Sequence, residues 1–147
     1  MRPDAGDLLM GSFGTLLMDI VPNLNATYAT GSATLVGLLM YCASLEYERG
    51  AQVRSTENGT FRHIFRDAAP YLDGDLAARV AEAAEGTDES LAISALNAAN
   101  DYLRRVLIDL HAHVEEVEAA WARETERAIL EALDASAKMR AIALPQL

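Results

Sequence analysis

The chain has little cysteine and little proline. Its 147 residues include one cysteine and four prolines. A single cysteine excludes an intrachain disulfide. Cys42 also lies within an apolar run, so we expect a buried, unreactive thiol and a cytoplasmic location. Scarce proline and plentiful alanine favour helices, and no strand-like alternation of apolar and polar residues competes with them.

Basic residues are outnumbered by acidic ones. The chain has 12 lysines and arginines against 22 aspartates and glutamates, which gives a formal net charge of −10. An acidic surface repels the phosphates of nucleic acids and of anionic lipids. We therefore expect no nucleic-acid partner.

Charged residues are missing between Asp19 and Glu46. A membrane-spanning helix needs about 20 continuous apolar residues, but Pro22 and the asparagines that follow it interrupt this stretch. The uninterrupted apolar part, residues 35–45, is shorter than a span. We therefore expect no membrane segment, and we interpret residues 35–42 as a central bundle helix that is buried on all sides.

The strongest pattern in the sequence is an apolar seam with alternating steps of three and four residues. Such a seam is buried only as one stripe of a long helix against partner helices. It predicts an all-α fold, a helix bundle of four to five mostly antiparallel helices in a single domain of residues 1–147, with one long helix from about residue 88 to 121. The seam positions are Ile93, Leu96, Asn100, Leu103, Leu107, Leu110, Val114, Val117 and Trp121.

Capping residues and prolines set the bounds of the other expected helices. The first begins after Asp4 or Asp7 and ends before Pro22. The second begins near Thr27, continues through the Asn58–Gly59 pair and ends before Pro70. A third runs from Asp73 or Asp75 to Glu85, with Gly86 as its cap.

Beyond Trp121 the apolar residues leave the seam register and shift to Ile129, Leu130 and Leu133. The stripe has therefore rotated around the helix. Residues 122–144 are either an oligomerisation arm on a second copy of the chain or a helix folded back on its own bundle. Because cyclic dimers are the commonest assemblies of soluble proteins, we expect a homodimer.

Polar residues within apolar stripes are the candidates for chemistry, since burying a charge is costly unless it is compensated. Glu57 lies between Val53 and Phe61 on one helical face, and Asn100 interrupts the seam. A Glu–Arg pair and a hydrogen-bond network that fix helix register are the simpler interpretation. The alternative is a small polar pocket between helices, with these candidate ligand-binding residues: Glu57, His63, Asn100, Asp101, Arg104 and His111.

A metal centre of the di-iron carboxylate kind needs Glu-x-x-His on each of two helices. The chain lacks that pattern and contains only the reverse order, His113-x-x-Glu116. We therefore predict no metal and no cofactor. A weaker alternative is a metal–carboxylate protein that uses Glu46, Glu57, Asp109, His113 and Glu116.

Enzyme signatures are also missing from the sequence. The stretch Gly11-Ser12-Phe13-Gly14 has no preceding strand and no following lysine, so it is no phosphate loop. The prediction is a soluble helical-bundle interaction or regulatory module without catalytic activity of its own, with itself or another protein as partner. The alternative is a small-molecule-binding or enzymatic bundle built on the polar pocket.

Overall fold

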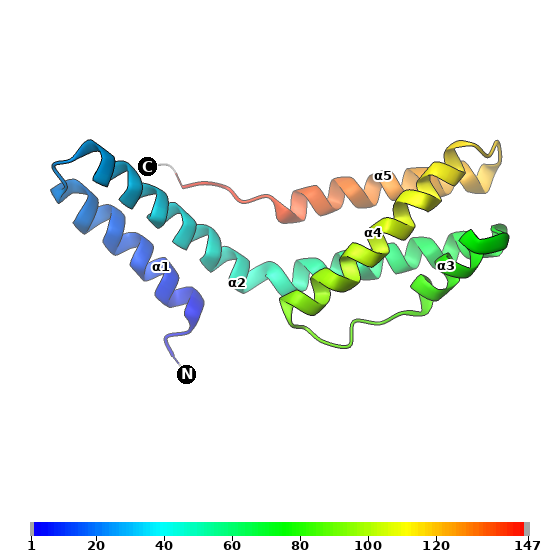
Figure 1. The fold of residues 1–147 in the computed structure, drawn as a ribbon, viewed down its shortest axis with the longest axis horizontal. Coiled ribbons are helices and arrows are strands. Elements are labelled where there is room, and N and C mark those ends of the chain that lie inside the picture. The colour runs from blue at the N-terminus through cyan, green and yellow to red at the C-terminus, as the bar shows by residue number, and fades with distance from the viewer. Residues whose placement is uncertain (1, 146–147) are drawn as a thin grey trace. The chain divides into compact units, whose positions relative to one another are not determined.

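The computed structural model describes residues 2–145, and within them the chain forms five α-helices and no strand (Figure 1). The predicted all-α fold is confirmed. The helices are α1 (Ala5–Thr15), α2 (Thr27–Ala68), α3 (Gly74–Glu85), α4 (Ile93–Glu115) and α5 (Ala120–Arg140). The described chain divides into unit 1, residues 2–50 with 142–145, and unit 2, residues 51–141. The single domain stays a prediction.

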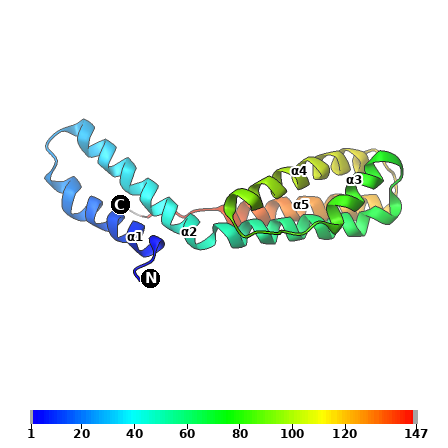
Figure 2. The ribbon, with the colours of Figure 1, turned by 60° about the horizontal axis from the view of Figure 1, so that its bottom comes forward.

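Unit 1 is an antiparallel helical hairpin. Asp4 caps α1, because its carboxylate accepts a hydrogen bond from the backbone amide of Asp7 at 3.0 Å. α1 continues into a short π-helix (Leu16–Ile20) and a 3-10 helix (Val21–Asn23), which together with α1 make the first arm of the hairpin. Pro22 ends this arm, because proline cannot continue a helix. The first part of α2 then runs back beside α1 in both views (Figures 1 and 2).

Hydrogen bonds and close packing hold unit 1 together. The Ser44 hydroxyl donates to the Gly6 carbonyl at 3.1 Å, and the Tyr41 hydroxyl donates to the Ala143 carbonyl at 3.0 Å. Gly37 allows close packing, because a Cβ there would lie 3.3 Å from the side chain of Leu17. The Ser44–Gly6 bond and the packing at Gly37 join α1 and its extension to α2, and the Tyr41 bond holds residue 143 against α2.

The expectation that residues 35–42 are buried on all sides is wrong. Leu35 is 58% exposed and Leu39 is 59% exposed, because within unit 1 a single helix covers one face of α2. Cys42 is partly buried. The segment Thr27–Tyr71 is long and apolar enough to cross a membrane, and 11% of its 18-residue apolar window is buried. This buried fraction is low for the core helix of a folded domain, which would be mostly buried.

Unit 2 packs the second part of α2 with α3, α4 and α5 around one core (Figure 2). α2 continues through Asn58–Gly59, as predicted, and ends at Ala68, two residues before Pro70. The largest fully buried apolar side chains come from all four helices and are Phe61, Phe65, Val80, Leu96, Leu103, Val106, Leu110 and Ile129.

The long helix is shorter than the predicted range of residues 88–121. It begins at Ile93, because the Asp88 carboxylate accepts hydrogen bonds from Asn58 and Arg62 instead of capping α4. It ends at Glu115, and Trp121 belongs to α5. α5 folds back on α4 and buries Ile129 in the shared core. Residues 120–140 therefore form a helix that folds back on its own bundle, which was the second alternative. The homodimer stays a prediction.

Core packing gives a direct test of this arrangement. Leu110→Ala removes a side chain with no exposed surface, so we expect a loss of about 2–5 kcal/mol in the free energy of unfolding. Ile108→Ala, two residues away on the same helix and 66% exposed, is the control and should change it by about 0.5 kcal/mol or less. Urea denaturation of both variants measures the difference. A loss below about 1 kcal/mol for Leu110→Ala would contradict the packing of α4.

Candidate functional site

Glu57 is a buried carboxylate in unit 2, with 1% of its surface exposed. Its Oε1 atom accepts hydrogen bonds from Ser136 Oγ at 2.6 Å and from Arg104 Nη2. Its Oε2 atom accepts from Asn100 Nδ2 at 3.1 Å and from Arg140 Nη2. The two guanidinium groups compensate the charge whose burial would otherwise be costly.

The hydrogen bonds continue from Glu57 across the interior. Asn100 Oδ1 accepts from Arg104 Nε at 2.9 Å, and Asn100 Nδ2 also donates to Asn58 Oδ1 at 2.9 Å. Asn58 Nδ2 donates to Asp88 Oδ1 at 3.0 Å, and Arg62 pairs with the same oxygen at 2.7 Å. We call this set the interior polar cluster: Glu57, Asn58, Arg62, Asp88, Asn100, Arg104, Ser136 and Arg140.

The electrostatic surroundings of Glu57 favour its ionised form. Burial raises the pKa of its carboxyl group. Hydrogen bonds from Ser136 and Arg140, together with the positive charges of Arg104 and Arg140, lower the pKa by more, so the net result lies below the ordinary value. Glu57 is therefore a carboxylate held by cations, which makes it a weak proton acceptor.

Helical spacing explains why these polar residues meet. Glu57 shares a face of α2 with Phe61 and Ile64, and Asn100 shares a face of α4 with Leu96 and Leu103. On α5, steps of three and four residues lead from Ile129 through Ala132 to Ser136 and Arg140. The cluster therefore joins α2, α4 and α5 from their inward stripes.

Three of the six predicted site residues come together, namely Glu57, Asn100 and Arg104. The side chain of His63 is 70% exposed and lies 3.5 Å from Asp67. It is two residues past the buried Phe61, about 200° around the helix. Asp101 is exposed, about 100° from Asn100. His111 is partly buried and lies two turns beyond Arg104. The predicted six-residue pocket therefore does not form as one site.

Sequence reasoning missed Ser136, Arg140 and Asp88 as partners in this cluster. The signal for the first two was present, because both continue the stripe of Ile129 at helical spacing. Asp88 lies in the connection between α3 and α4, where no periodicity indicates which way a side chain points.

The residues of the metal–carboxylate alternative are separately engaged. Glu46 lies in unit 1, whereas the other four lie in unit 2. Asp109 pairs with Arg79 of α3, and the ring of His113 stacks on Trp121 with centroids 6.4 Å apart. The oxygens of Glu57 are occupied by arginines. Within unit 2, Glu57, Asp109 and His113 of this predicted set therefore contact different partners and do not converge on one ion.

The cavities near the cluster are small. One of about 130 Å³ lies between α4 and α5, and one of about 280 Å³ lies beside α3 and α4. Ligand pockets commonly enclose roughly 300–1,000 Å³. The residues that line them are Arg104, Leu107, Ile108, His111, Ile129 and Leu133 for the smaller cavity, and Arg62, Glu82, Ala83, Gly86, Thr87, Ala99, Tyr102 and Leu103 for the larger.

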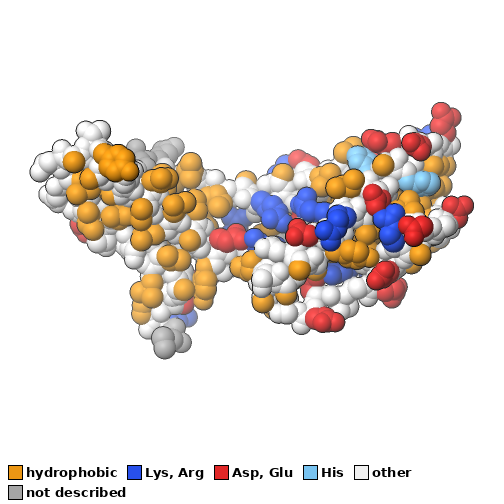
Figure 3. Space-filling view, in the orientation of Figure 1, with side chains coloured by type: hydrophobic (Ala, Val, Ile, Leu, Met, Phe, Trp, Pro, Cys, Tyr) orange, Lys and Arg blue, Asp and Glu red, His pale blue; other side chains and the backbone are white. Residues whose placement is uncertain are grey.

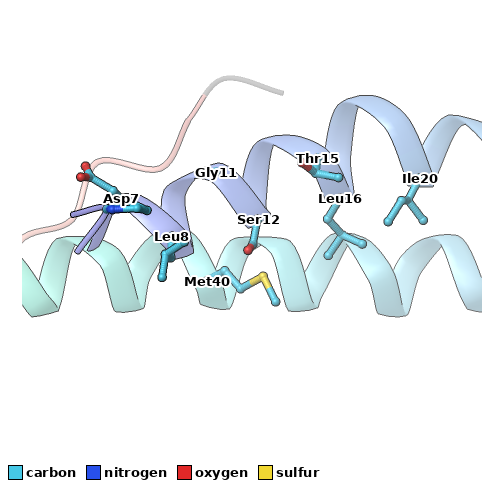
Figure 4. A pocket seen from close by; sticks show the side chains of 9 residues that line it. Asp7, Leu8, Gly11, Ser12, Thr15, Leu16, Ile20 and Met40 are labelled. Carbon is cyan, nitrogen blue, oxygen red and sulfur yellow. The ribbon is translucent and has the colours of Figure 1, made fainter. Parts of the chain in front are cut away.

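Unit 1 carries a larger groove, of about 520 Å³, along α1 (Figure 4). Met40 of α2 closes one side of it, and Asp7 contributes the charged group at one end. The lining is mostly apolar or small and includes Leu8, Gly11, Ser12, Thr15, Leu16 and Ile20. Such a groove accommodates apolar side chains, and it offers a single ionisable group for chemistry.

Comparison with known proteins finds no family model, no curated protein and no solved structure that matches this chain. Function is therefore inferred from the chain's own geometry. The interior polar cluster links α2, α4 and α5, because its members form hydrogen bonds with one another across these helices.

Removal of the Glu57 charge should weaken unit 2. Glu57→Gln leaves Arg104 and Arg140 without their anion, and we expect a loss of roughly 3 kcal/mol in the free energy of unfolding at pH 7. Because the folded-state pKa of Glu57 is lowered, its contribution is present above the unfolded pKa of about 4.3 and is lost as the pH falls through the folded value. The stability gap between wild type and variant should therefore narrow from pH 5 to pH 3.

Urea denaturation at pH values from 5 to 3 measures the difference in free energy of unfolding between wild type and Glu57→Gln. Glu131→Gln, at an exposed position of α5, is the matched control and should behave as wild type at each pH. A gap between wild type and Glu57→Gln that stays constant down to pH 3 would show that the carboxylate is not held by the two arginines.

Proposed function

We propose that the protein is a helical-bundle interaction module without catalytic activity of its own, and that it pairs with a second copy through unit 1. The observation that supports this is the number of large apolar side chains that unit 1 leaves exposed. They are Leu8, Met10, Met18, Ile20, Tyr28, Leu35, Val36, Leu39 and Tyr47, each at least 37% exposed.

Unit 1 exposes many large apolar side chains for a single helical hairpin. Apolar side chains cover much of the visible face of α1 and of the first part of α2 (Figure 3). Nine large apolar side chains of residues 2–50 in this unit are each at least 37% exposed, and exposed apolar surface that gathers in this way marks interaction sites. A standard interface buries about 800 Å² of each partner. An association with a second copy would bury the apolar side chains that unit 1 exposes.

The charge pattern favours contact between two copies at this surface. The chain carries a net charge of −10, which opposes self-association elsewhere, but no charged residue occurs between Asp19 and Glu46. Three glycines of the hairpin also have open space where a side chain would be. A Cβ at Gly11, Gly14 or Gly31 would meet nothing within 4 Å. These positions leave room for the backbone of another helix.

A protein partner suits this surface better than lipid. The exposed Asp19 lies between the exposed Met18 and Ile20 near the end of the first arm. A carboxylate in the hydrocarbon of a bilayer is unfavourable by up to about 2.5–3.5 kcal/mol, the value at the bilayer centre. The exposed Ser12, Thr15 and Ser32 also find hydrogen-bond partners on a protein surface more readily than in hydrocarbon.

The interior polar cluster supports the non-catalytic part of the proposal. A general acid or base must reach the substrate, whereas Glu57 is 1% exposed and donors from α4 and α5 bind both of its oxygens. Arg104 and Arg140 further hold it ionised. Its role is therefore to position helices.

Two matched substitutions locate the dimer interface. Leu39 on α2 is 59% exposed and Leu130 on α5 is 52% exposed. We expect Leu39→Glu to convert the dimer into a monomer, because a charge would be buried in the interface, and Leu130→Glu to leave the dimer intact. Light scattering after size exclusion measures the mass of each variant.

Three results would overturn the proposal. In the first, Leu130→Glu dissociates the dimer and Leu39→Glu does not, so the partner binds α5. In the second, the wild type is a monomer at all concentrations. In the third, the wild type floats with phosphatidylcholine vesicles and Leu39→Glu abolishes flotation, so the occupant of the surface is lipid.

A further inference from the structure

A histidine and two glutamates converge where α4 meets α5 in unit 2. They are His111 and Glu115 of α4 and Glu126 of α5, and one ligand atom from each lies within 4.8 Å of the others. His111 Nε2 is 3.7 Å from Glu115 Oε1, which is too long for a hydrogen bond. None of the three belongs to the interior polar cluster.

The imidazole of His111 has an unused nitrogen. Its Nε2 atom is buried and has no hydrogen-bond partner among the described residues. A buried polar atom without a partner costs roughly 1–3 kcal/mol, so such atoms in native proteins commonly have a function or bind an ion. The nitrogen that lacks a hydrogen-bond partner is also the one that lies 3.7 Å from Glu115 Oε1.

Local geometry positions all three groups. The four-residue spacing of His111 and Glu115 places them on one face of α4. The turn over residues 116–119 then returns the chain, and α5 brings Glu126 to that face nearly two turns after it begins. His111 lines the small cavity between α4 and α5 together with Ile129, which is three residues past Glu126. The site is therefore built on two packed helices.

We propose that His111, Glu115 and Glu126 form a binding site for Zn²⁺ that links α4 to α5. One imidazole nitrogen and two carboxylate oxygens are ligands that zinc accepts at about 2.0–2.2 Å, with water in the fourth position. Ca²⁺ and Mg²⁺ prefer oxygen ligands alone. The ligand atoms lie within 4.8 Å of one another, and the carboxylate of the exposed Glu115 can rotate toward an ion placed between them. The two carboxylates balance the charge of the ion.

Isothermal titration of the full chain with ZnCl₂, after treatment with a chelator, tests the site. We expect one zinc ion per chain and a rise in the thermal midpoint, because the ion binds the folded state alone. His111→Gln and Glu126→Gln should each weaken zinc binding roughly tenfold or more. MgCl₂ at the same concentrations should give no saturable heat.

His63 provides the matched control. It has a carboxylate, Asp67, at the same four-residue spacing and at 3.5 Å, and both side chains are exposed. His63→Gln should leave zinc affinity and stoichiometry unchanged, because a single His–carboxylate pair is no site. The proposal is overturned if zinc gives no saturable binding, if Glu126→Gln binds as wild type does, or if His63→Gln loses zinc as His111→Gln does. These results are independent of the oligomeric state.

Discussion

The pairing of the buried Glu57 carboxylate with Arg104 and Arg140 is the interaction on which unit 2 depends. Glu57 comes from α2, Arg104 from α4 and Arg140 from α5, so one side chain joins three helices. An apolar core alone tolerates several helix registers, whereas a buried charge requires its partners at fixed positions. Asn58 and Asn100 extend the same constraint to the start of α4. The cluster thereby specifies the geometry around it.

The two units distribute polar and apolar residues in opposite ways. Unit 2 buries apolar side chains together with the carboxylate of Glu57, while unit 1 leaves large apolar side chains exposed and has no charged residue between Asp19 and Glu46. The proposed association surface therefore lies in unit 1, whereas the polar cluster that fixes the positions of helices lies in unit 2. The proposed zinc site also lies in unit 2, where it would reinforce the contact of α4 with α5.

Sequence periodicity predicted most of the fold, because helical spacing is a local property. The positions of Leu96, Leu103 and Leu110 and the continuity of α2 through Asn58–Gly59 were available from residue spacing alone. Burial was harder to predict, since apolar residues such as Leu35 indicate a helix but not whether another element covers it. The site was predicted in part. Glu57, Asn100 and Arg104 stood out as polar residues on apolar stripes, whereas Asp88 and Glu126 depend on how loops return the chain.

The central claim is that Glu57 and Arg140 stabilise each other across α2 and α5. A double-mutant cycle of Glu57→Gln and Arg140→Met, followed by urea denaturation at pH 7, measures this coupling directly. We expect a coupling energy of about 1–3 kcal/mol, because Glu57→Gln leaves Arg140 without its anion, Arg140→Met leaves Glu57 with Arg104 alone, and the double variant contains neither member of the pair. Arg104 loses its anion in the Glu57→Gln variant and in the double variant alike, so this loss cancels in the cycle. Additive losses, with a coupling energy below about 0.3 kcal/mol, would contradict it.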